Sequence, residues 1–393
     1  MVAPPFAGAG TPRALIAGAG PAGDAVAAGL RDAGFDGEII LCGAEPVAPY
    51  ERPHLSKGYL QGTVAVDRLP LRPREQYREL HVDLMLGKMV VNLGLDRRTA
   101  VLDSGRAVPW DRLCIATGSD ARRLPSIPEA IYLRQLAQAE DLRGLIQRGE
   151  RLDIIGAGFI GCEVAAVAVA KGCDVHVHEA LEQPLLRVLG AELGAFLAKV
   201  HREHGVELAL NVESLSDLRG AVLAAVGSEP RVALAEAAGL DVDRGIVVDE
   251  LGRTSAPDVF AAGDVTRFFS PLYETHIRVE HFQTAQRQGF AVGRAMAGLR
   301  EPYSEVPWFW SDQYGLNLQY AGAGLPWDET VIRGDLGKPP FTVFYLRGGE
   351  LIAAAGVNDH HTVARARHAM QARARLTRRQ LEDPTFDLRR APA

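Results

Sequence analysis

Short apolar runs alternate with alanine-rich, helix-prone stretches along the first half of the chain, and one such unit occurs twice. The run Ala14–Ala17 leads into a glycine-rich turn, a helical stretch that ends near Gly34, and a second apolar run, Glu38–Glu45. About 140 residues later, Leu152–Ile155 begins the same series, which closes with Asp174–Glu179. Short apolar runs separated by helical patterns are typical of parallel strands joined by helices, so each copy is predicted to be a βαβ unit.

Each copy carries the motif GxGxxG between its first strand and its helix. In this motif the first glycine permits a tight turn, the second lets a pyrophosphate approach the backbone, and the third lets helix and strand pack closely. Free N–H groups at the positive helix end then hold the phosphates. A single motif also arises for purely structural reasons, but two copies flanked by strands predict two dinucleotide sites. Their residues are Gly18, Gly20, Pro21, Ala22 and Gly23 in the first copy, and Gly156, Gly158, Phe159, Ile160 and Gly161 in the second.

An acidic residue follows each motif at the end of the second strand. These residues are Glu45 and Glu179, where the hydroxyl groups of a ribose are expected. A carboxylate there accepts hydrogen bonds from the ribose and repels a 2′-phosphate, so Glu179 favours NADH over NADPH. Either glutamate could instead be a solvated strand end.

Two later strand-to-glycine passages favour the first copy as the flavin site. Cys114–Ser119 runs from an apolar strand into a turn of small residues, and Asp258–Val265 does the same. We expect the backbone to pass close to the cofactor at both places, and a carboxylate at Asp264 could accept hydrogen bonds from a ribitol chain. The alternative for Asp264 is a helix N-cap. The expected contacts in these passages are Ala116, Thr117, Gly118, Gly263 and Asp264.

The composition is that of an ordinary folded protein. With 393 residues, 47% of them apolar and 23% charged, the chain is long enough for two or three domains. The net charge of −6 lacks the basic excess that nucleic-acid binding requires, so we expect no nucleic-acid partner. Even the apolar run from Ile154 to Ala170 carries Glu163, so we expect no membrane-spanning helix.

The cysteines lie far apart, with no CxxC and no His-rich spacing. This usage argues against a disulfide framework and against a structural zinc site, and it fits a reducing cytoplasm. The N-terminus has no basic region before its apolar run, so we expect a short tail before the first strand. The four cysteines are Cys42, Cys114, Cys162 and Cys173.

Together these elements resemble the two-dinucleotide flavoprotein superfamily. Pro49–Lys57 narrows the resemblance to the ferredoxin reductases that serve bacterial oxygenases, and Gly158–Ala165 and Val279–Gly289 agree with it. Val306–Tyr314, with the sequence VPWFWSDQY, is the most diagnostic segment. The similarity covers almost the whole chain apart from a short tail at each end.

The resemblance implies an α/β fold with two Rossmann-like dinucleotide-binding domains in a glutathione-reductase-like architecture, followed by an α+β C-terminal domain. The FAD domain is expected to be split in sequence, at residues 1–121 and 245–305. The NAD domain would be inserted between them at 122–244, and the C-terminal domain, at 306–393, would cover the flavin face.

The resemblance also assigns roles to individual side chains. Lys57 would contact FAD near the reactive edge of the isoalloxazine, and Glu163 would pair with Lys57 and approach the nicotinamide. A buried lysine without a partner is costly, which makes this pairing physically sensible. Lys57 could instead be a solvated lysine after a turn, and Glu163 could serve only the helix dipole. The other assigned contacts are Arg52, Val90, Arg123, Glu280, His281, Phe282 and Trp310 for FAD, and Gly227 for NAD.

The function that the resemblance implies is transfer of electrons from NADH through FAD to a two-iron two-sulfur ferredoxin that feeds an oxygenase. The protein would be a monomer or a homodimer. A flavin disulfide or peroxide reductase would need a redox cysteine near the flavin, and none of the four cysteines fits. A second alternative is an NADH-binding flavoprotein with a signalling role, similar to apoptosis-inducing factor. For Trp308 and Trp310, ordinary core packing competes with a place beside the flavin.

Several positions depart from the family pattern. Phe282 and His54 stand where tryptophan and proline are usual, and Arg231 replaces an asparagine, which puts the NAD contact there in doubt. The stretch 206–227 is shortened by roughly a hairpin, which predicts a smaller edge sheet.

The last segment of the chain gathers arginines in a helix-prone run. We expect some of them to steer an acidic ferredoxin, although such runs are also ordinary solvated helix faces. The arginines are Arg365, Arg367, Arg373, Arg375, Arg378 and Arg379.

Overall fold

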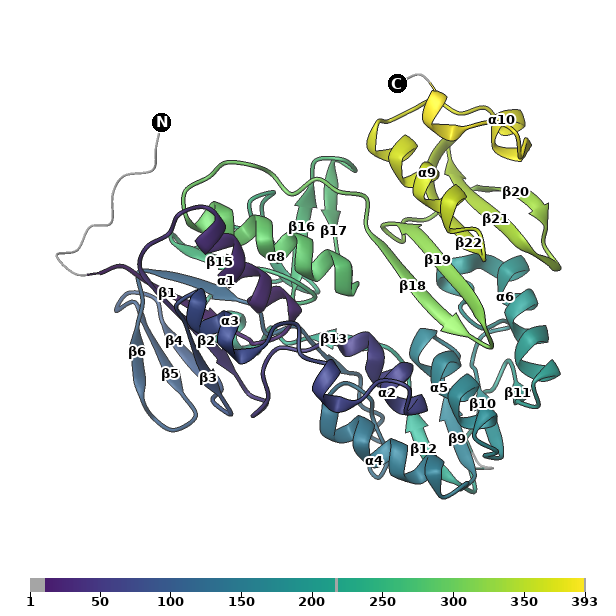
Figure 1. The fold of residues 1–393 in the computed structure, drawn as a ribbon, viewed down its shortest axis with the longest axis horizontal. Helices are drawn as coiled ribbons and strands as arrows, with labels where there is room; N and C mark the ends of the chain where they lie inside the picture. The colour runs from purple at the N-terminus through teal and green to yellow at the C-terminus, as the bar shows by residue number, and fades with distance from the viewer. Residues whose placement is uncertain (1–10, 216–217, 392–393) are drawn as a thin grey trace. The chain divides into compact units, whose positions relative to one another are not determined.

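The computed structural model describes residues 11–215 and 218–391, which belong to two compact units (Figure 1). Each unit collects three segments of the chain. The first contains the residues up to 51, then 69–120 and 230–307; the second contains 52–68, 121–229 and the residues from 308 onward.

The first unit is built on a parallel sheet of five strands in the order β15-β7-β1-β2-β3. In the central register, Ile16 lies opposite both Leu41 and Cys114, and all three are buried. Strands buried on both faces are continuous apolar runs, which is the pattern seen in the sequence. The strands are β1 (Arg13–Ala17), β2 (Glu38–Gly43), β3 (Val82–Leu86), β7 (Arg112–Ile115) and β15 (Val259–Ala261).

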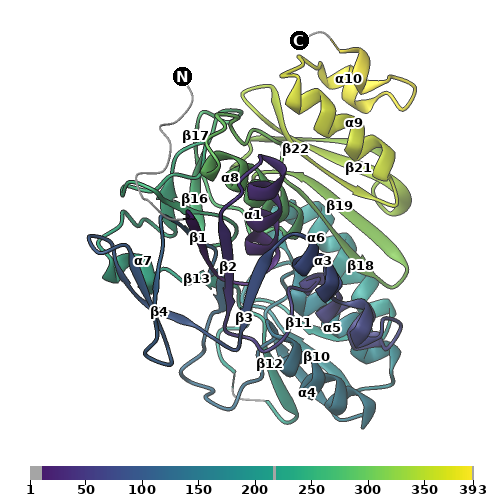
Figure 2. The ribbon, with the colours of Figure 1, turned by 60° about the vertical axis from the view of Figure 1, so that its left-hand side comes forward.

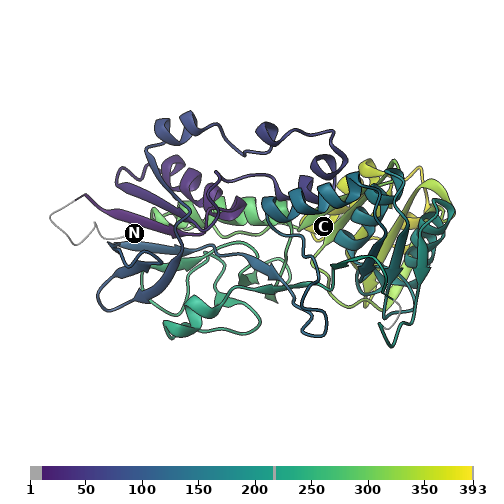
Figure 3. The same cartoon turned by 90° about the horizontal axis from the view of Figure 1, so that it is seen from below.

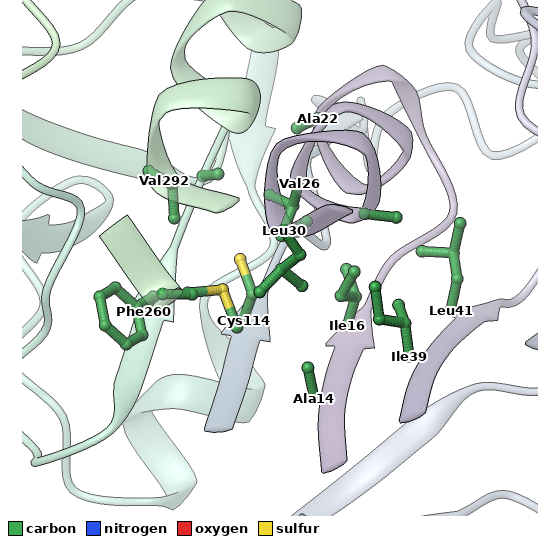
Figure 4. Close-up of a cluster of buried hydrophobic side chains, with 14 of the residues drawn as sticks. Ala14, Ile16, Ala22, Val26, Leu30, Ile39, Leu41, Cys114, Phe260 and Val292 are labelled. Atoms are coloured by element: carbon green, nitrogen blue, oxygen red, sulfur yellow. The ribbon is translucent and has the colours of Figure 1, made fainter. Parts of the chain in front are cut away.

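Helices α1 (Pro21–Asp32) and α8 (Phe282–Met296) pack side by side in this unit (Figure 3). Glycines allow the close approach, since a Cβ on Gly29 would meet the carbonyl oxygen of Phe290 at 2.1 Å. In Figure 4, Leu30 of α1 lies beside residues of β1 and β7 in the buried cluster. The apolar face of α1 thus forms one core with the sheet and α8.

Smaller elements complete the first unit. One antiparallel sheet contains β4 (Val90–Gly94), β5 (Thr99–Leu102) and β6 (Ala107–Pro109), and a second sheet contains β14 (Ile246–Val248), β16 (Thr266–Ser270) and β17 (Thr275–Ile277). The short helices are α3 (Arg74–Glu79) and α7 (Ala233–Ala237). A separate two-stranded sheet, which belongs wholly to neither unit, contains β8 (Ser119–Ala121) and β13 (Ser228–Pro230).

The second unit contains a four-stranded parallel sheet in the order β11-β10-β9-β12. Its strands are β9 (Leu152–Ile155), β10 (Val175–His178), β11 (Glu207–Ala209) and β12 (Ala221–Ala224). Within the described part of the stretch 206–227, no strand lies between β11 and β12, so this sheet is entirely parallel. Residues 216 and 217 of that stretch lie outside the described residues. The helices of this part are α4 (Leu136–Gln147), α5 (Phe159–Ala170) and α6 (Leu186–Glu203).

The last part of the second unit is an antiparallel sheet in the order β18-β19-β22-β21-β20, with α9 packed against β19 and β22 (Figure 2). The strands are β18 (Trp308–Gln313), β19 (Leu316–Gly322), β20 (Glu329–Asp335), β21 (Lys338–Arg347) and β22 (Glu350–Val357). The helices are α9 (His360–Gln371), α10 (Arg378–Glu382) and η3 (Leu388–Arg390). The segment 52–68 adds η1 (Arg52–Ser56), α2 (Gly58–Gln61) and η2 (Val66–Arg68).

The predicted fold class is confirmed: two parallel, Rossmann-like sheets are present, together with a C-terminal α+β part. Both predicted βαβ units are present, as β1-α1-β2 and β9-α5-β10. Within the described residues, no helix combines the length and the apolar character needed to cross a membrane.

Candidate functional site

The predicted flavin contacts of the first unit gather where its parallel strands end. Ligands of open α/β sheets bind at this carboxyl edge, because the loops and the helix N-terminus meet there. Gln288 of α8 ties the loop after β15 to the helix, since the backbone N–H of Gly263 donates to its Oε1 at 2.7 Å. The residues that directly follow the strand ends are Gly18 to Gly23 after β1, Glu45 after β2, Ala116 to Gly118 after β7, and Gly263 and Asp264 after β15.

The three glycines of the first motif have different surroundings. A Cβ on Gly18 would meet the carbonyl oxygen of Ala116 at 2.1 Å, and one on Gly23 would meet that of Gly18 at 1.9 Å. Around Gly20, no described atom lies within 4 Å of the same position. The outer glycines are therefore required by the packing of the turn, and the middle glycine faces open space. This is the surface that a pyrophosphate needs in order to reach the backbone.

The second motif repeats this arrangement. Added Cβ atoms would meet the carbonyl oxygen of Ala225 at 2.6 Å from Gly156, and that of Gly156 at 2.1 Å from Gly161. On Gly158 the nearest atom within reach would be 3.9 Å away. Two cradles of the same design therefore stand at the N-termini of α1 and α5, and the residues present fit a dinucleotide at each.

The start of α8 carries a buried hydroxyl that suits a ligand. Thr284 is 3% exposed, and among the described residues its Oγ1 has no hydrogen-bond partner. Nearby, burial lowers the pKa of His281 to about 4, although the charge of Asp264 raises it. A buried polar atom without a partner is rare in folded proteins, and a bound group that supplies the partner accounts for it.

The two acidic residues of the βαβ units are held by defined donors. Glu45 accepts a hydrogen bond from the hydroxyl of Tyr50 at 2.8 Å. Glu179 accepts from the backbone N–H of Ala157 at 2.6 Å and of Leu181 at 2.9 Å. Glu179 is thus fixed against the glycine loop and is not a free strand end.

Asp264 lies in a turn before β16 and accepts a hydrogen bond from Ser119 Oγ at 3.3 Å. Because no helix begins there, the alternative of a helix N-cap is wrong.

Lys57 and Glu163 form an ion pair inside the second unit. Lys57 Nζ lies 2.7 Å from Glu163 Oε1, and the side chains are only 14% and 4% exposed. Glu163 projects from α5, the helix that begins at the second glycine motif, and Lys57 follows η1. Neither side chain matches the plainer alternative, because Lys57 is not solvated and Glu163 is engaged by specific donors.

Two serines complete the surroundings of Glu163, and sequence reasoning did not single them out. Ser56 Oγ donates to Glu163 Oε2, and Ser311 Oγ donates to Glu163 Oε1 at 2.7 Å. Together with the ammonium of Lys57, three donors therefore surround the buried carboxylate. The signal was present, since both serines lie in the two segments, Pro49–Lys57 and Val306–Tyr314, that carry the resemblance.

Other assigned residues occupy varied positions in the second unit. Arg52 donates to the backbone carbonyl of Arg134 at 2.6 Å, and the guanidinium of Arg123 lies 4.2 Å from the ring centre of Tyr132. Trp308 and Trp310 are partly buried, with ring centres 5.9 Å apart.

The remaining assigned residues are backbone or helix-start positions. Gly227 precedes β13 with a φ of 104°, which favours glycine. Val90 begins β4, and Phe282 begins α8 directly after Glu280 and His281. The atypical Arg231 places its guanidinium 3.2 Å from Asp120 in the first unit.

The four cysteines are free and buried. A disulfide reductase needs a reactive cysteine, and reactive cysteines are partly exposed. Burial raises the pKa of Cys42 to about 11, with a further contribution from Asp83. Burial also raises the pKa values of Cys114, Cys162 and Cys173. The thiolate, which is the reactive form, is therefore disfavoured at all four positions.

Two family models match the chain. The model described as pyridine nucleotide-disulphide oxidoreductase matches residues 12–218 and 218–289, and the model described as reductase C-terminal matches 308–392. Together they span both glycine cradles and the C-terminal sheet.

Relatives agree over nearly the full length. The ferredoxin–NAD(+) reductase component of the anthranilate 1,2-dioxygenase system from Burkholderia cepacia is 38% identical, over 95% of this chain and 98% of the relative. Putidaredoxin reductase from Pseudomonas putida is 36% identical over 88% of each chain. The crystal structure of the covalent putidaredoxin reductase–putidaredoxin complex superposes with a TM-score of 0.92 at 34% identity, over 96% of this chain and 97% of that one. This chain therefore belongs to the pyridine nucleotide-disulphide oxidoreductase family, and within it to the FAD-dependent ferredoxin reductases of oxygenase systems.

Proposed function

We propose that this protein passes electrons from NADH through FAD to a two-iron two-sulfur ferredoxin that feeds an oxygenase. The observation that carries the proposal is the pair of matching glycine cradles, each with a packed outer pair and an open middle glycine. The relatives named above are ferredoxin reductases, which favours this function over a signalling role similar to that of apoptosis-inducing factor.

In this proposal the first cradle holds FAD and the second holds NADH. The FAD domain comprises residues 1–121 and 245–305, the NAD domain 122–244, and the C-terminal domain 306–393. When bound, FAD supplies the conversion between the two electrons of NADH and the single electrons that an iron-sulfur protein accepts. The protein supplies binding, orientation and electrostatics.

Lys57 and Glu163 act in this proposal as a charged pair beside the reacting rings. The ammonium of Lys57 supports negative charge at the flavin edge, and Glu163 keeps that ammonium oriented and its charge compensated. The remaining flavin contacts are proposed at the first motif and at Glu45, Arg52, Val90, Ala116, Thr117, Gly118, Arg123, Gly263, Asp264, Glu280, His281, Phe282 and Trp310. Those of NADH are proposed at the second motif, Glu179 and Gly227.

An acidic ferredoxin is the proposed partner, and exposed arginines near the C-terminus are the proposed steering charges. Of the six arginines in the run, Arg378 is engaged by Glu329 at 2.6 Å and Glu382 at 2.8 Å, and Arg367 lies over the ring of Trp308. Arg375 and Arg379 are exposed, and they make no ion pair with any described residue. They are therefore the members of the run best able to act on an incoming partner.

The purified protein tests this function directly. We expect a flavin absorption spectrum, bleaching of the flavin by NADH faster than by NADPH, and rapid reduction of a ferredoxin, with cytochrome c as the final acceptor. A colourless protein that cannot be reconstituted with FAD would overturn the proposal. A long-lived charge-transfer species with negligible transfer to any ferredoxin would support the signalling role instead.

A further inference from the structure

A line of polar side chains runs from Glu163 through the interior of the second unit. Ser311 and Gln313 lie on β18, His201 lies near the end of α6, and Tyr314 follows β18. The buried members are 0% exposed at Ser311, 5% at Gln313 and 2% at His201. Nothing in the proposed contacts with FAD or NADH uses these four residues, although three of them belong to the diagnostic segment Val306–Tyr314.

Consecutive hydrogen bonds join these residues. Gln313 Nε2 donates to Ser311 Oγ at 3.1 Å, and His201 Nε2 lies 3.0 Å from Gln313 Oε1. The hydroxyl of Tyr314 lies 2.7 Å from His201 Nδ1. With the bond from Ser311 to Glu163, the chain has four links and ends on the carboxylate that pairs with Lys57.

The direction of every link follows from the charge on Glu163. An ionised carboxylate can only accept hydrogen bonds. Ser311 must therefore donate its single hydroxyl proton to Glu163, and it must accept a hydrogen bond from Gln313. The amide nitrogen of Gln313 therefore faces Ser311 and its oxygen faces His201, which must donate from Nε2. Nδ1 of His201 is then an acceptor, and Tyr314 donates to it. All four links donate toward Glu163.

A neutral His201 is required for this arrangement, and its surroundings provide one. Burial lowers the pKa of His201 to about 4, although the bond with Gln313 raises it; the charge of His204 lowers it further. The ring of His204 stacks on that of Tyr314 with centres 4.0 Å apart. At neutral pH the ring of His201 thus has one donor and one acceptor nitrogen, as the chain needs.

We propose that Tyr314, His201, Gln313 and Ser311 form a one-way hydrogen-bond chain that orients Glu163 toward Lys57, and that they are positioning residues for electron entry from NADH. The proposal rests on the function proposed above. Its physical basis is cooperativity: a hydroxyl that itself accepts a hydrogen bond donates a stronger one and is held more rigidly than an isolated hydroxyl. The chain also links the C-terminal sheet to the helix that begins at the second cradle.

Stopped-flow reduction of the bound flavin by NADH tests the role in turnover. Ser311→Ala removes the last donor, and we expect the limiting rate of flavin reduction to fall roughly tenfold, while the apparent Kd for NADH changes less than about twofold. Ser311→Thr keeps the hydroxyl and should restore the rate to within about twofold. A rate in Ser311→Ala equal to that of the wild type would overturn the proposal.

Combining variants separates a chain from independent contacts. Tyr314→Phe alone should slow flavin reduction by a few-fold, and the double variant Ser311→Ala with Tyr314→Phe should be no slower than Ser311→Ala. In the hydrogen bonds among the described residues, Tyr314 connects to Glu163 only through Ser311, so effects of the two substitutions that multiply would refute the chain. Wild-type protein that binds no flavin, or whose flavin NADH does not reduce, would refute the proposed function. The hydrogen-bond chain would then be tested by the tautomer of His201, which does not depend on turnover.

The tautomer of His201 gives a readout that does not depend on turnover. In protein labelled with ¹⁵N-histidine, the resonance missing from a His201→Asn variant identifies this ring. We expect the neutral form with the proton on Nε2 at pH 7, and a change in its ¹⁵N shifts in Tyr314→Phe. A proton on Nδ1 would reverse the direction of the links and overturn the proposal.

Discussion

Glu163 Oε1 receives both the ammonium of Lys57 and the hydroxyl of Ser311, each at 2.7 Å. One carboxylate oxygen thus joins a cation from the segment 52–68 to a strand of the C-terminal sheet. Because Ser56 Oγ donates to the other oxygen, the carboxylate is held at both ends. A carboxylate held by donors at both oxygens has one defined orientation on α5.

Removing one charge of the Lys57–Glu163 ion pair should destabilise the fold much more than removing both. Glu163→Leu leaves the ammonium of Lys57 buried without its counter-charge and should lower the free energy of unfolding by about 3 kcal/mol. The double variant Lys57→Met with Glu163→Leu replaces both charges by apolar groups and should recover most of that loss, yet reduce its flavin slowly. Urea unfolding followed by circular dichroism measures the first effect. Equal stability of the single and double variants would contradict it.

The cradle glycines should divide into two classes. In flavin-stripped protein, Gly23→Ala should lose about 1–3 kcal/mol of stability because its Cβ collides with the carbonyl of Gly18. Gly20→Ala should keep its stability within about 0.5 kcal/mol but bind FAD at least roughly tenfold more weakly. Thermal unfolding and flavin titration distinguish the two. The matched pair Gly161→Ala and Gly158→Ala should behave in the same way toward NADH.

Coenzyme preference should depend on Glu179. Glu179→Ala removes the charge that repels a 2′-phosphate and should narrow the ratio of kcat/KM for NADH over NADPH by about tenfold, or about 1.4 kcal/mol. The exposed Glu182, three residues later, is the control, and Glu182→Ala should leave the ratio unchanged. An unaltered ratio in Glu179→Ala would remove the reason for assigning NADH to this site.

Acid should weaken the second unit through Asp153 on β9. Burial acts to raise the pKa of Asp153, but hydrogen bonds from Arg151, from the backbone of Arg219 and Gly220, and with His178 lower it below its usual range. A carboxyl with a lower pKa in the folded state stabilises the fold above its unfolded pKa of about 4, and this contribution fades as the pH falls toward the folded pKa.

Asp153→Asn should therefore cost roughly 2 kcal/mol of stability at pH 7, and the difference from the wild type should shrink below about pH 4. Denaturant titrations at several pH values measure it, with the exposed Asp141→Asn as the control. A difference that stays constant from pH 7 to pH 3 would refute this assignment.

Partner steering should be sensitive to salt. Arg375→Glu with Arg379→Glu should raise the KM for an acidic ferredoxin several-fold at low ionic strength, and the effect should disappear as salt is added. Arg97→Glu, an exposed change in the β4–β5 hairpin, controls for net charge. Rates with wild-type protein that do not respond to ionic strength would argue against steering by this run.

The sequence alone was sufficient where function depends on local pattern. Both cradles could be located from strand, glycine and helix spacing, because each is formed by contiguous residues. The partners of Glu163 could not be located this way, since Ser311 is 148 residues from it and His201 is 112 residues from Gln313. Hydrophobic periodicity carries no information on which polar side chains meet across such separations.

Long-range structure also decides two further features that the sequence pattern could not predict, the setting of Asp264 and the place of residues 52–68. The N-cap alternative for Asp264 arose because a carboxylate after a strand looks the same before a helix or a turn, and here β16 follows. Residues 52–68 belong to the second compact unit although their neighbours on both sides belong to the first. That excursion depends on long-range contacts such as the one between Lys57 and Glu163.

The glycine-lined contact between α1 and α8 also constrains how the chain is made. Val26 of α1 and Gly293 of α8 meet at the backbone, yet more than 260 residues separate them, so a ribosome must add α8 before α1 has its packing partner. The fifth strand, β15, also arrives late. During synthesis the first parallel sheet therefore stays incomplete, and the apolar face of α1 stays uncovered, until β15 and α8 are added. The parallel sheet of β9 to β12 is synthesised before them as a complete set of strands, so it is free to fold first.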